Sequence, residues 1–204
     1  MINFRPGDGI GISGRNCRGR VIQACTCAMG GINHVVLVGQ GSDGVRWWEA
    51  STTTRTRDLY ADKVLSGVQV HHIARRLAEE GPKGSVVWHY PIRVPLLHPG
   101  MISGLREWCR NQHGRPYDYY GAFQARVLAG GSLRRWLFRT RENLHSYFCS
   151  EFVAAALRQV GEFPCHDASE WSPAALCHAL VETGSHWPPV LIQGPYAHWG
   201  RRVG

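Results

Sequence analysis

Residues 148–160 carry an apolar pattern that a helix satisfies and a strand does not. The apolar side chains recur at the i, i+3, i+4, i+7, i+8 and i+11 spacing of one helix face, and they are Cys149, Phe152, Val153, Ala156, Leu157 and Val160. A face this apolar has to pack against other elements, so we expect a core helix with Cys149 in its first turn. Ser146 is the expected N-cap, which would make Cys149 the N3 residue.

A cysteine in the first turn of a helix is well placed for nucleophilic chemistry. The free backbone N–H groups and the helix dipole favour the thiolate and lower the pKa of the thiol. The same N–H groups can stabilise an oxyanion during acyl transfer. An isolated cysteine is also often just a small buried apolar residue, so the position of Cys149 alone leaves both interpretations open.

A β-hairpin upstream supplies two further polar side chains. Residues 35–38 form a continuous apolar run typical of a strand buried on both faces. A turn sequence at residues 40–44 and a second apolar run at residues 45–50 complete the predicted hairpin. His34 and Glu49 both lie near its open end, and only the register would say which faces they occupy.

Glu49 is the more informative of these two residues. It follows Trp47 and Trp48 directly, and a carboxylate within an aromatic strand is costly to bury without a partner. We therefore expect a cationic or imidazole partner for Glu49. A thiol, an imidazole and a carboxylate are the groups of a cysteine hydrolase. Their order here is His, Glu, Cys, so the nucleophile comes last and not first.

The remaining patterns predict an α+β fold in a single domain spanning residues 1–204. Strands are predicted at residues 7–14, 68–74 and 85–94, and helices at residues 18–29, 99–111, 126–141 and 173–182. We expect a central, mostly antiparallel sheet that carries His34 and Glu49 and packs against the helix of Cys149. No element is predicted after Thr183, where the chain is rich in Pro, Gly and Trp.

The composition is that of a globular protein with an excess of positive charge. Hydrophobic residues make up 44% of the 204 residues and charged residues 19%, with a formal net charge of +8. Such a charge suits an anionic partner such as a wall polymer, a phospholipid or a nucleic acid, although a basic protein without such a partner fits equally well. In the basic stretch, Arg134, Arg135 and Arg139 could contact an anionic surface, but a solvated helix face is the more frequent meaning of such a pattern, and we do not expect a nucleic-acid function.

The cysteines predict neither a disulfide framework nor a metal site. The seven cysteines, at positions 17, 25, 27, 109, 149, 165 and 177, are odd in number and irregularly spaced, which fits a reducing compartment. The paired C-x-x-C spacing of zinc sites is missing, so we expect no metal and no organic cofactor. The N-terminal residues lack a signal-peptide h-region and no window could span a membrane; we expect a cytoplasmic product, which a phage or another system would have to deliver to any substrate outside.

Five short motifs in one order carry a resemblance to a known family. They are Gly7-Asp8-Gly9-Ile10, Asn33-His34-Val35, Trp48-Glu49-Ala50, Gly114-Arg115-Pro116-Tyr117-Asp118 and Tyr147-Phe148-Cys149-Ser150-Glu151. Residues 7–160 thereby resemble the circularly permuted branch of the NlpC superfamily, the YiiX-like papain-fold cysteine hydrolases, and residues 161–204 form a C-terminal extension. The sequence differs from the family pattern at Asn33, where Ser or Thr is usual, and at Gly9, where an apolar residue is commoner.

The resemblance implies a role for each of six residues. Cys149 would be the nucleophile, His34 the general base and Glu49 the residue that orients the imidazole. Tyr117, Tyr147 and Asn33 would lie on the substrate-binding side. Glu151, two positions beyond Cys149, is expected to be structural.

Three functions remain open at this point. The first is a cysteine amidase or peptidase that acts on cell-wall peptides or related amide bonds. The second is a lipid-directed acyltransferase or thioesterase, because relatives of lecithin:retinol acyltransferase share the order with histidine first; their usual third member is a second histidine, so Glu49 argues mildly against them. The third is a non-catalytic binding or assembly protein that keeps the fold.

Overall fold

Six strands form an antiparallel sheet in the order β4-β3-β2-β1-β5-β6. The strands are β1 (Gly9–Ser13), β2 (His34–Gln40), β3 (Val45–Ser51), β4 (Gly67–His71), β5 (Val86–Tyr90) and β6 (Val190–Gln193). The computed structural model describes residues 2–14, 31–52, 54–93, 98–121, 145–165 and 167–194. The α+β class and the antiparallel sheet are confirmed.

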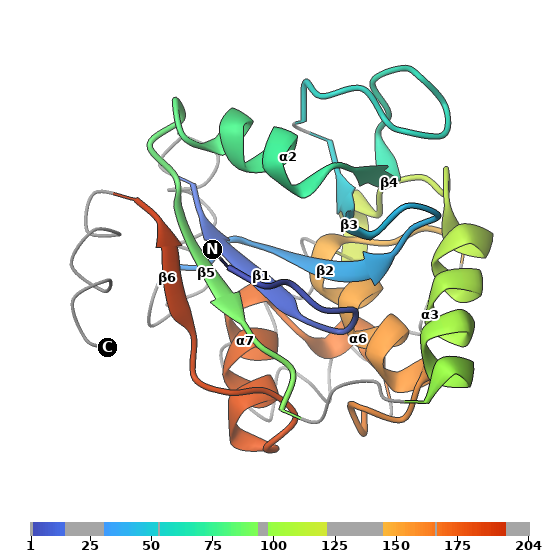
Figure 1. Cartoon of the computed structure of the whole chain (residues 1–204), viewed down its shortest axis with the longest axis vertical. Helices are drawn as coiled ribbons and strands as arrows, with labels where there is room; N and C mark the ends of the chain where they lie inside the picture. Colours follow the sequence, from blue (N-terminus) through green and yellow to red (C-terminus); the bar gives the residue numbers. More distant parts are fainter. Residues whose placement is uncertain are drawn as a thin grey trace.

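Helices cover both faces of this sheet. They are α2 (Ile73–Glu80), α3 (Pro99–Gln112), α6 (Cys149–Gln159), α7 (Pro173–Glu182) and a short 3-10 helix, Ala168–Glu170. In Figure 1, α2 lies above the central strands while α6 and α7 lie below them, with α3 beside α6. None of the helices in the described ranges is long and apolar enough to cross a membrane.

The sheet separates two hydrophobic clusters. The larger one joins α3, α6 and α7 to Val35, Leu37 and Trp48, and the smaller one joins α2 to Val36 and Trp47. Neighbouring residues of β2 and β3 enter different clusters because side chains alternate along a strand. This explains the continuous apolar run of residues 35–38, which is buried on both faces as predicted.

Most of the predicted elements that fall on described residues are present. The predicted helices at residues 99–111, 148–160 and 173–182 correspond to α3, α6 and α7, and the predicted hairpin to β2 and β3. The predicted helices at residues 18–29 and 126–141, and with them Arg134, Arg135 and Arg139, lie outside the described residues.

The strand predicted at residues 68–74 is wrong in its second half. Strand β4 ends at His71, and the chain then forms α2. The inward face of α2 consists of Ile73, Arg76 and Glu80, all buried. Two of these three positions are charged, so the 3.6-residue period does not stand out in the hydrophobic pattern.

Strand β6 lies after Thr183, where no element is predicted. It has four residues and pairs with β5 at the edge of the sheet, with an irregular register near Val87 and Trp88. A strand this short carries too little alternation to be recognised in the sequence.

The first residue of β4 allows a loop to approach closely. A Cβ at Gly67 would lie 2.0 Å from the Arg115 carbonyl oxygen, and the φ angle of Gly67 is +120°. The Val68 N–H donates to the same carbonyl at 2.9 Å. Glycine thus permits the contact that anchors residues 114–116, the segment that leads into Tyr117.

Candidate active site

The open end of the β2–β3 hairpin is where the predicted catalytic groups meet. Strands β2 and β3 pair from Leu37 to Gln40 against Val45 to Trp48, whereas β2 begins at His34 and β3 runs on to Ser51. Beyond Trp48 the partner of β3 is β4, and the start of β2 pairs with β1. Helix α6 contacts both β2 and β3, and its first residue reaches the N–H of Val35.

His34 and Glu49 form a short ionic hydrogen bond. The His34 Nε2 atom lies 2.6 Å from the Glu49 Oε2 atom, and the Glu49 side chain is fully buried. Glu49 is two positions beyond Trp47 in β3, and alternate residues of a strand share a face, so it lies on the α2 side with Trp47. Glu49 therefore has the imidazole partner that its burial predicts.

Cys149 is the N1 residue of α6, and the predicted N-cap at Ser146 is wrong. The N-cap is Phe148, whose N–H donates to the Glu151 Oε2 atom at 3.5 Å. Glu151 thus caps the helix from position N3, in agreement with a structural role. The apolar pattern fixes the helix, but the boundary could not be predicted from Ser146, because a cap can shift by one or two residues without changing the apolar face.

The environment of Cys149 favours a thiolate paired with an imidazolium. Burial alone would raise the pKa of the Cys149 thiol, but a hydrogen bond and the charge of His34, with the N–H groups of Val35 and Ser150, bring it below its usual value. For His34, burial lowers the pKa, but hydrogen bonds to Cys149 and Glu49 outweigh burial and raise it to about 10. The His34 ring thus lies between thiol and carboxylate, with Nε2 directed at Glu49.

The start of α6 is held by an aromatic cluster and a hydrogen bond. The ring centroids of Trp108, Tyr147 and Phe152 lie 5.6–6.1 Å apart in pairs. The Ser150 hydroxyl donates to the Trp171 carbonyl oxygen at 2.5 Å, which ties α6 to the segment before α7. Cys149 is therefore presented by a rigid part of the larger core.

Arg76 is a member of the site that the sequence patterns do not identify. Its Nε atom donates to Glu49 Oε1 at 2.7 Å, and its Nη2 atom to Glu49 Oε2 at 3.3 Å. Burial raises the pKa of Glu49, but the Arg76 charge and the His34 contact outweigh it and hold the pKa well below the usual range. A helical interpretation of residues 73–80 would have placed Arg76 on an inward face and so identified the cation that Glu49 requires.

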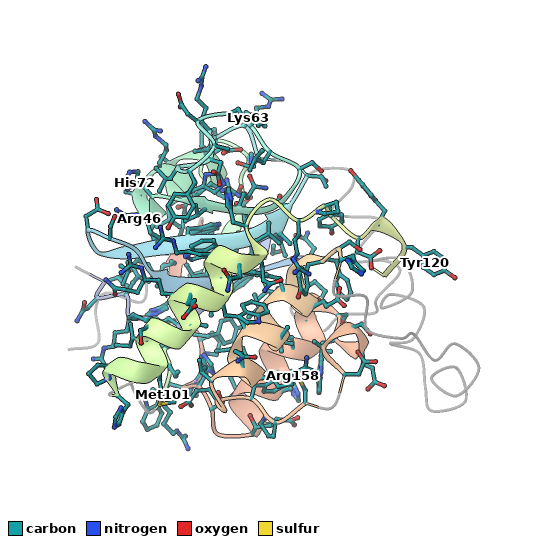
Figure 2. All side chains as sticks on the ribbon, turned by 90° about the vertical axis from the view of Figure 1, so that its right-hand side faces the viewer. Arg46, Lys63, His72, Met101, Tyr120 and Arg158 are labelled. Carbon is teal, nitrogen blue, oxygen red and sulfur yellow. The ribbon has the colours of Figure 1, made fainter. Side chains whose placement is uncertain are left out.

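Tyr117 and Tyr147 lie next to one another beside the helix start. They form an isolated parallel bridge, with the Tyr147 N–H donating to the Pro116 carbonyl. Tyr147 is buried and its hydroxyl lies 3.3 Å from Gln112 Oε1, whereas Tyr117 is half-buried and its ring packs on exposed Tyr119. Exposed Tyr120, next along the chain, projects away from the molecule in Figure 2.

Asn33 fastens the segment before β2. Its Nδ2 atom donates to the Gly14 carbonyl at 3.0 Å, and its Oδ1 atom accepts from the Gly14 N–H at 3.2 Å. Both ends of the amide are thus bonded to the end of β1. Substrate contacts by Asn33, Tyr117 and Tyr147 stay predictions.

The described residues include no group of three or more His, Cys, Asp and Glu side chains arranged to hold a metal ion. Among the described residues, the thiols of Cys109, Cys149, Cys165 and Cys177 form no disulfide. The polar groups of the site are engaged with one another, as an imidazole between a thiol and a carboxylate.

The comparisons with known proteins bear on the fold. No protein-family model matches the sequence, and the comparison with curated proteins found no match. Among solved structures, the chain is similar to the metalloprotein YiiX from Escherichia coli O157:H7, DUF1105, with 16% identity and a TM-score of 0.51. The alignment covers 96% of this chain and 91% of that one. The chain therefore has a YiiX-like α+β fold.

Proposed function

We propose that the protein is a cysteine hydrolase of the amidase or peptidase type, with Cys149 as nucleophile, His34 as acid and base, and Glu49 as the carboxylate that orients His34. The observation that carries this proposal is the position of the His34 ring, 2.6 Å from Glu49 and hydrogen-bonded to the thiol at the N-terminus of α6. We further propose that the order His, Glu, Cys reflects a circularly permuted papain-like arrangement.

The chemistry follows from these groups. The Cys149 thiolate attacks the acyl carbon of an amide, and the N–H groups at the start of α6 favour the negative charge that develops there. The His34 imidazolium gives its proton to the leaving amine, and a thioester to Cys149 remains. Neutral His34 then takes a proton from water, the hydroxide displaces the thiolate from the acyl carbon, and the carboxylic acid leaves.

The test is the pH dependence of Cys149 alkylation by iodoacetamide, followed by mass spectrometry of the Cys149 peptide. We expect a thiolate at pH 6 in the wild type and its loss in His34→Ala. Half-buried Cys165 in the same protein is the reference thiol. A Cys149 that reacts no faster than Cys165, or titrates near the ~8.5 of a free cysteine, would favour the non-catalytic alternative.

An activated thiol would justify a panel of amide, ester and thioester substrates, with Cys149→Ala as the blank. Release of the acyl group to water supports the hydrolase. Transfer to an added amine or alcohol in preference to water would identify an acyltransferase instead.

A further inference from the structure

Helix α2 lies on the face of the sheet opposite α6, yet one of its side chains reaches the candidate site. We propose that Arg76 is a positioning residue: its guanidinium fixes the Glu49 carboxylate in the orientation that faces His34. This inference rests on the proposed function, because it gives Arg76 a part in keeping the Cys149–His34 pair competent.

The contact between Arg76 and Glu49 uses both carboxylate oxygens. Nε of Arg76 bonds Oε1 at 2.7 Å, and Nη2 reaches Oε2 at 3.3 Å. Oε2 also accepts from His34 at 2.6 Å. A two-point contact of this kind prevents rotation of the carboxylate about its terminal bond. The orientation toward His34 is therefore set from the α2 side.

Arg76 is itself held firmly. Its Nη1 atom lies 3.0 Å from both Glu80 Oε1 and Glu79 Oε2. Lys83 then bonds both of these glutamates at 2.7 and 2.8 Å. With its side chain only 2% exposed, the guanidinium has a carboxylate partner on each side and little freedom to move.

The second glutamate of this network is anchored to a loop. Glu79 accepts from the Thr54 and Thr56 hydroxyls and from the Arg55 and Thr56 N–H groups, at 2.5–3.2 Å. Burial raises the pKa of Glu79, but the hydrogen bond from Lys83, those from Thr56 and the Arg55 N–H, and the charge of Arg76 outweigh it and bring the pKa to about 2. Hydrogen bonds and ion pairs therefore connect the loop at residues 54–56 to Glu79, Glu79 to Arg76, and Arg76 to Glu49 in the site.

The charge of Arg76 can compensate Glu49 at the stages of the proposed cycle in which His34 is neutral. Three basic side chains face Glu49: His34 from β2, His71 from β4 with Nε2 at 3.7 Å, and Arg76 from α2. Burial lowers the pKa of His71, and His34 must become neutral each time it gives up its proton. Arginine stays charged at any working pH. Arg76 alone among the three can keep Glu49 ionised and in place through the whole cycle.

The experiment compares Arg76→Met, Arg76→Lys and Arg46→Met by the pH profile of Cys149 alkylation. Without Arg76, the pKa of buried Glu49 rises and the carboxylate is neutralised within the working range. The acid limb is the part of the profile where the rate falls as the pH falls. We expect this limb in Arg76→Met to move up by about one pH unit, which is roughly a tenfold loss of rate at a pH on the limb. Arg76→Lys keeps a charge without the two-point contact and should fall between Arg76→Met and the wild type.

Arg46→Met is the matched control. Arg46 is also largely buried, but it pairs with Asp43 and lies opposite Gly39, toward the turn of the hairpin and away from its open end. Its replacement should leave the acid limb unchanged. If Arg76 has only a structural role, Arg76→Met should have a lower Tm than the wild type and the same acid limb. That result would overturn the proposal. If Arg76→Met does not fold, a wild-type limb in Arg76→Lys overturns it equally.

A second readout separates this inference from the proposed function. In Cys149→Ala protein, carbon NMR of the Glu49 carboxylate should show titration at higher pH once Arg76 is replaced by Met. That result with an unreactive wild-type thiol would retain the role of Arg76 and reject the hydrolase. A Glu49 titration that does not change would reject the role of Arg76, whatever the thiol does.

Discussion

Both oxygens of Glu49 are committed to hydrogen-bond donors, and the side chain has no contact with solvent. An ionised carboxylate is stable in such a place only because Arg76 and His34 compensate its charge. The same carboxylate therefore serves the fold and the site. A substitution of Glu49 should therefore lower both the free energy of unfolding and the reactivity of the Cys149 thiol. This double effect distinguishes Glu49 from its neighbours.

Replacing Glu49 by Gln tests this double role. The amide would have to place its NH₂ group against a donor, either Arg76 or His34, and the negative charge between them would be lost. We expect a loss of about 3–5 kcal/mol in unfolding free energy and at least about tenfold slower Cys149 alkylation at pH 6. Urea denaturation and the alkylation rate measure the two effects.

Glu80→Gln is the control for Glu49→Gln. Glu80 is also buried and also pairs with Arg76, but it faces Lys83 and Ser85 instead of His34. Its replacement should cost stability. Because Glu79 still pairs with the Arg76 Nη1 atom at 3.0 Å, the alkylation rate should stay close to that of the wild type. An equal loss of reactivity in both variants would mean that Glu49 has no special relation to the thiol.

At the scale of elements, patterns in the sequence locate the hairpin and α6 but not α2. The hairpin and α6 bury apolar side chains, so their periods are visible as hydrophobic repeats. Helix α2 buries Arg76 and Glu80 as an ion pair, and a pattern analysis counts such residues as solvent-exposed. His34, Glu49 and Cys149 could therefore be predicted from the sequence, whereas Arg76 could be found only once α2 was known to face Glu49.

The loop between β3 and β4 depends on another buried carboxylate. Asp58 accepts hydrogen bonds from His113 Nε2, from the Val70 N–H and from the N–H groups of Tyr60 and Ala61, at 2.7–2.9 Å. Burial raises the pKa of Asp58, but these donors outweigh it and bring the pKa to about 2. Asp58 thus joins the loop to β4 and to the end of α3.

This lowered pKa gives Asp58 a pH-dependent contribution to stability. The contribution is complete above the unfolded pKa of about 4 and disappears as the pH falls from about 4 to about 2. We expect Asp58→Asn to lose about 2 kcal/mol at pH 7 and to approach the wild type at pH 2. Exposed Asp62 in the same loop is the control, and Asp62→Asn should change stability by less than about 0.5 kcal/mol. A pH-independent difference for Asp58→Asn would contradict the ionised state.

At the scale of the molecule, the candidate site needs both layers at once. Cys149 belongs to the core formed with α3 and α7, while Glu49 and Arg76 lie on the α2 side of the sheet. His34, at the open end of the hairpin, connects the two sides. The local pattern of each segment indicates its chemistry, but the meeting of the segments depends on contacts between residues more than 100 positions apart, which no short motif encodes.

Because of this arrangement, unfolding of the whole protein should slow the alkylation of Cys149, whereas unfolding makes the alkylation of an ordinary buried thiol faster. In the folded protein the lowered pKa of Cys149 should make it the fast thiol at pH 7, whereas burial raises the pKa of Cys177 to about 12 and raises that of Cys109 as well. Unfolding returns all three to the ~8.5 of a free cysteine. Alkylation of Cys149 should therefore slow as urea rises, while that of Cys109 and Cys177 becomes faster.

We expect these opposite changes to share one midpoint with the fluorescence of buried Trp47 and Trp48, which lie in the two different clusters. Because the six strands form one sheet between the clusters, neither core can be lost without exposing the other. Pulse alkylation at pH 7 with mass spectrometry of each cysteine peptide, beside tryptophan fluorescence, measures the midpoints. A different result would be that the alkylation of Cys149 slows at a lower urea concentration than the one at which the alkylation of Cys109 becomes faster. The site would then unfold before the α3 side of the core, and the two layers would be coupled less tightly than the shared sheet requires.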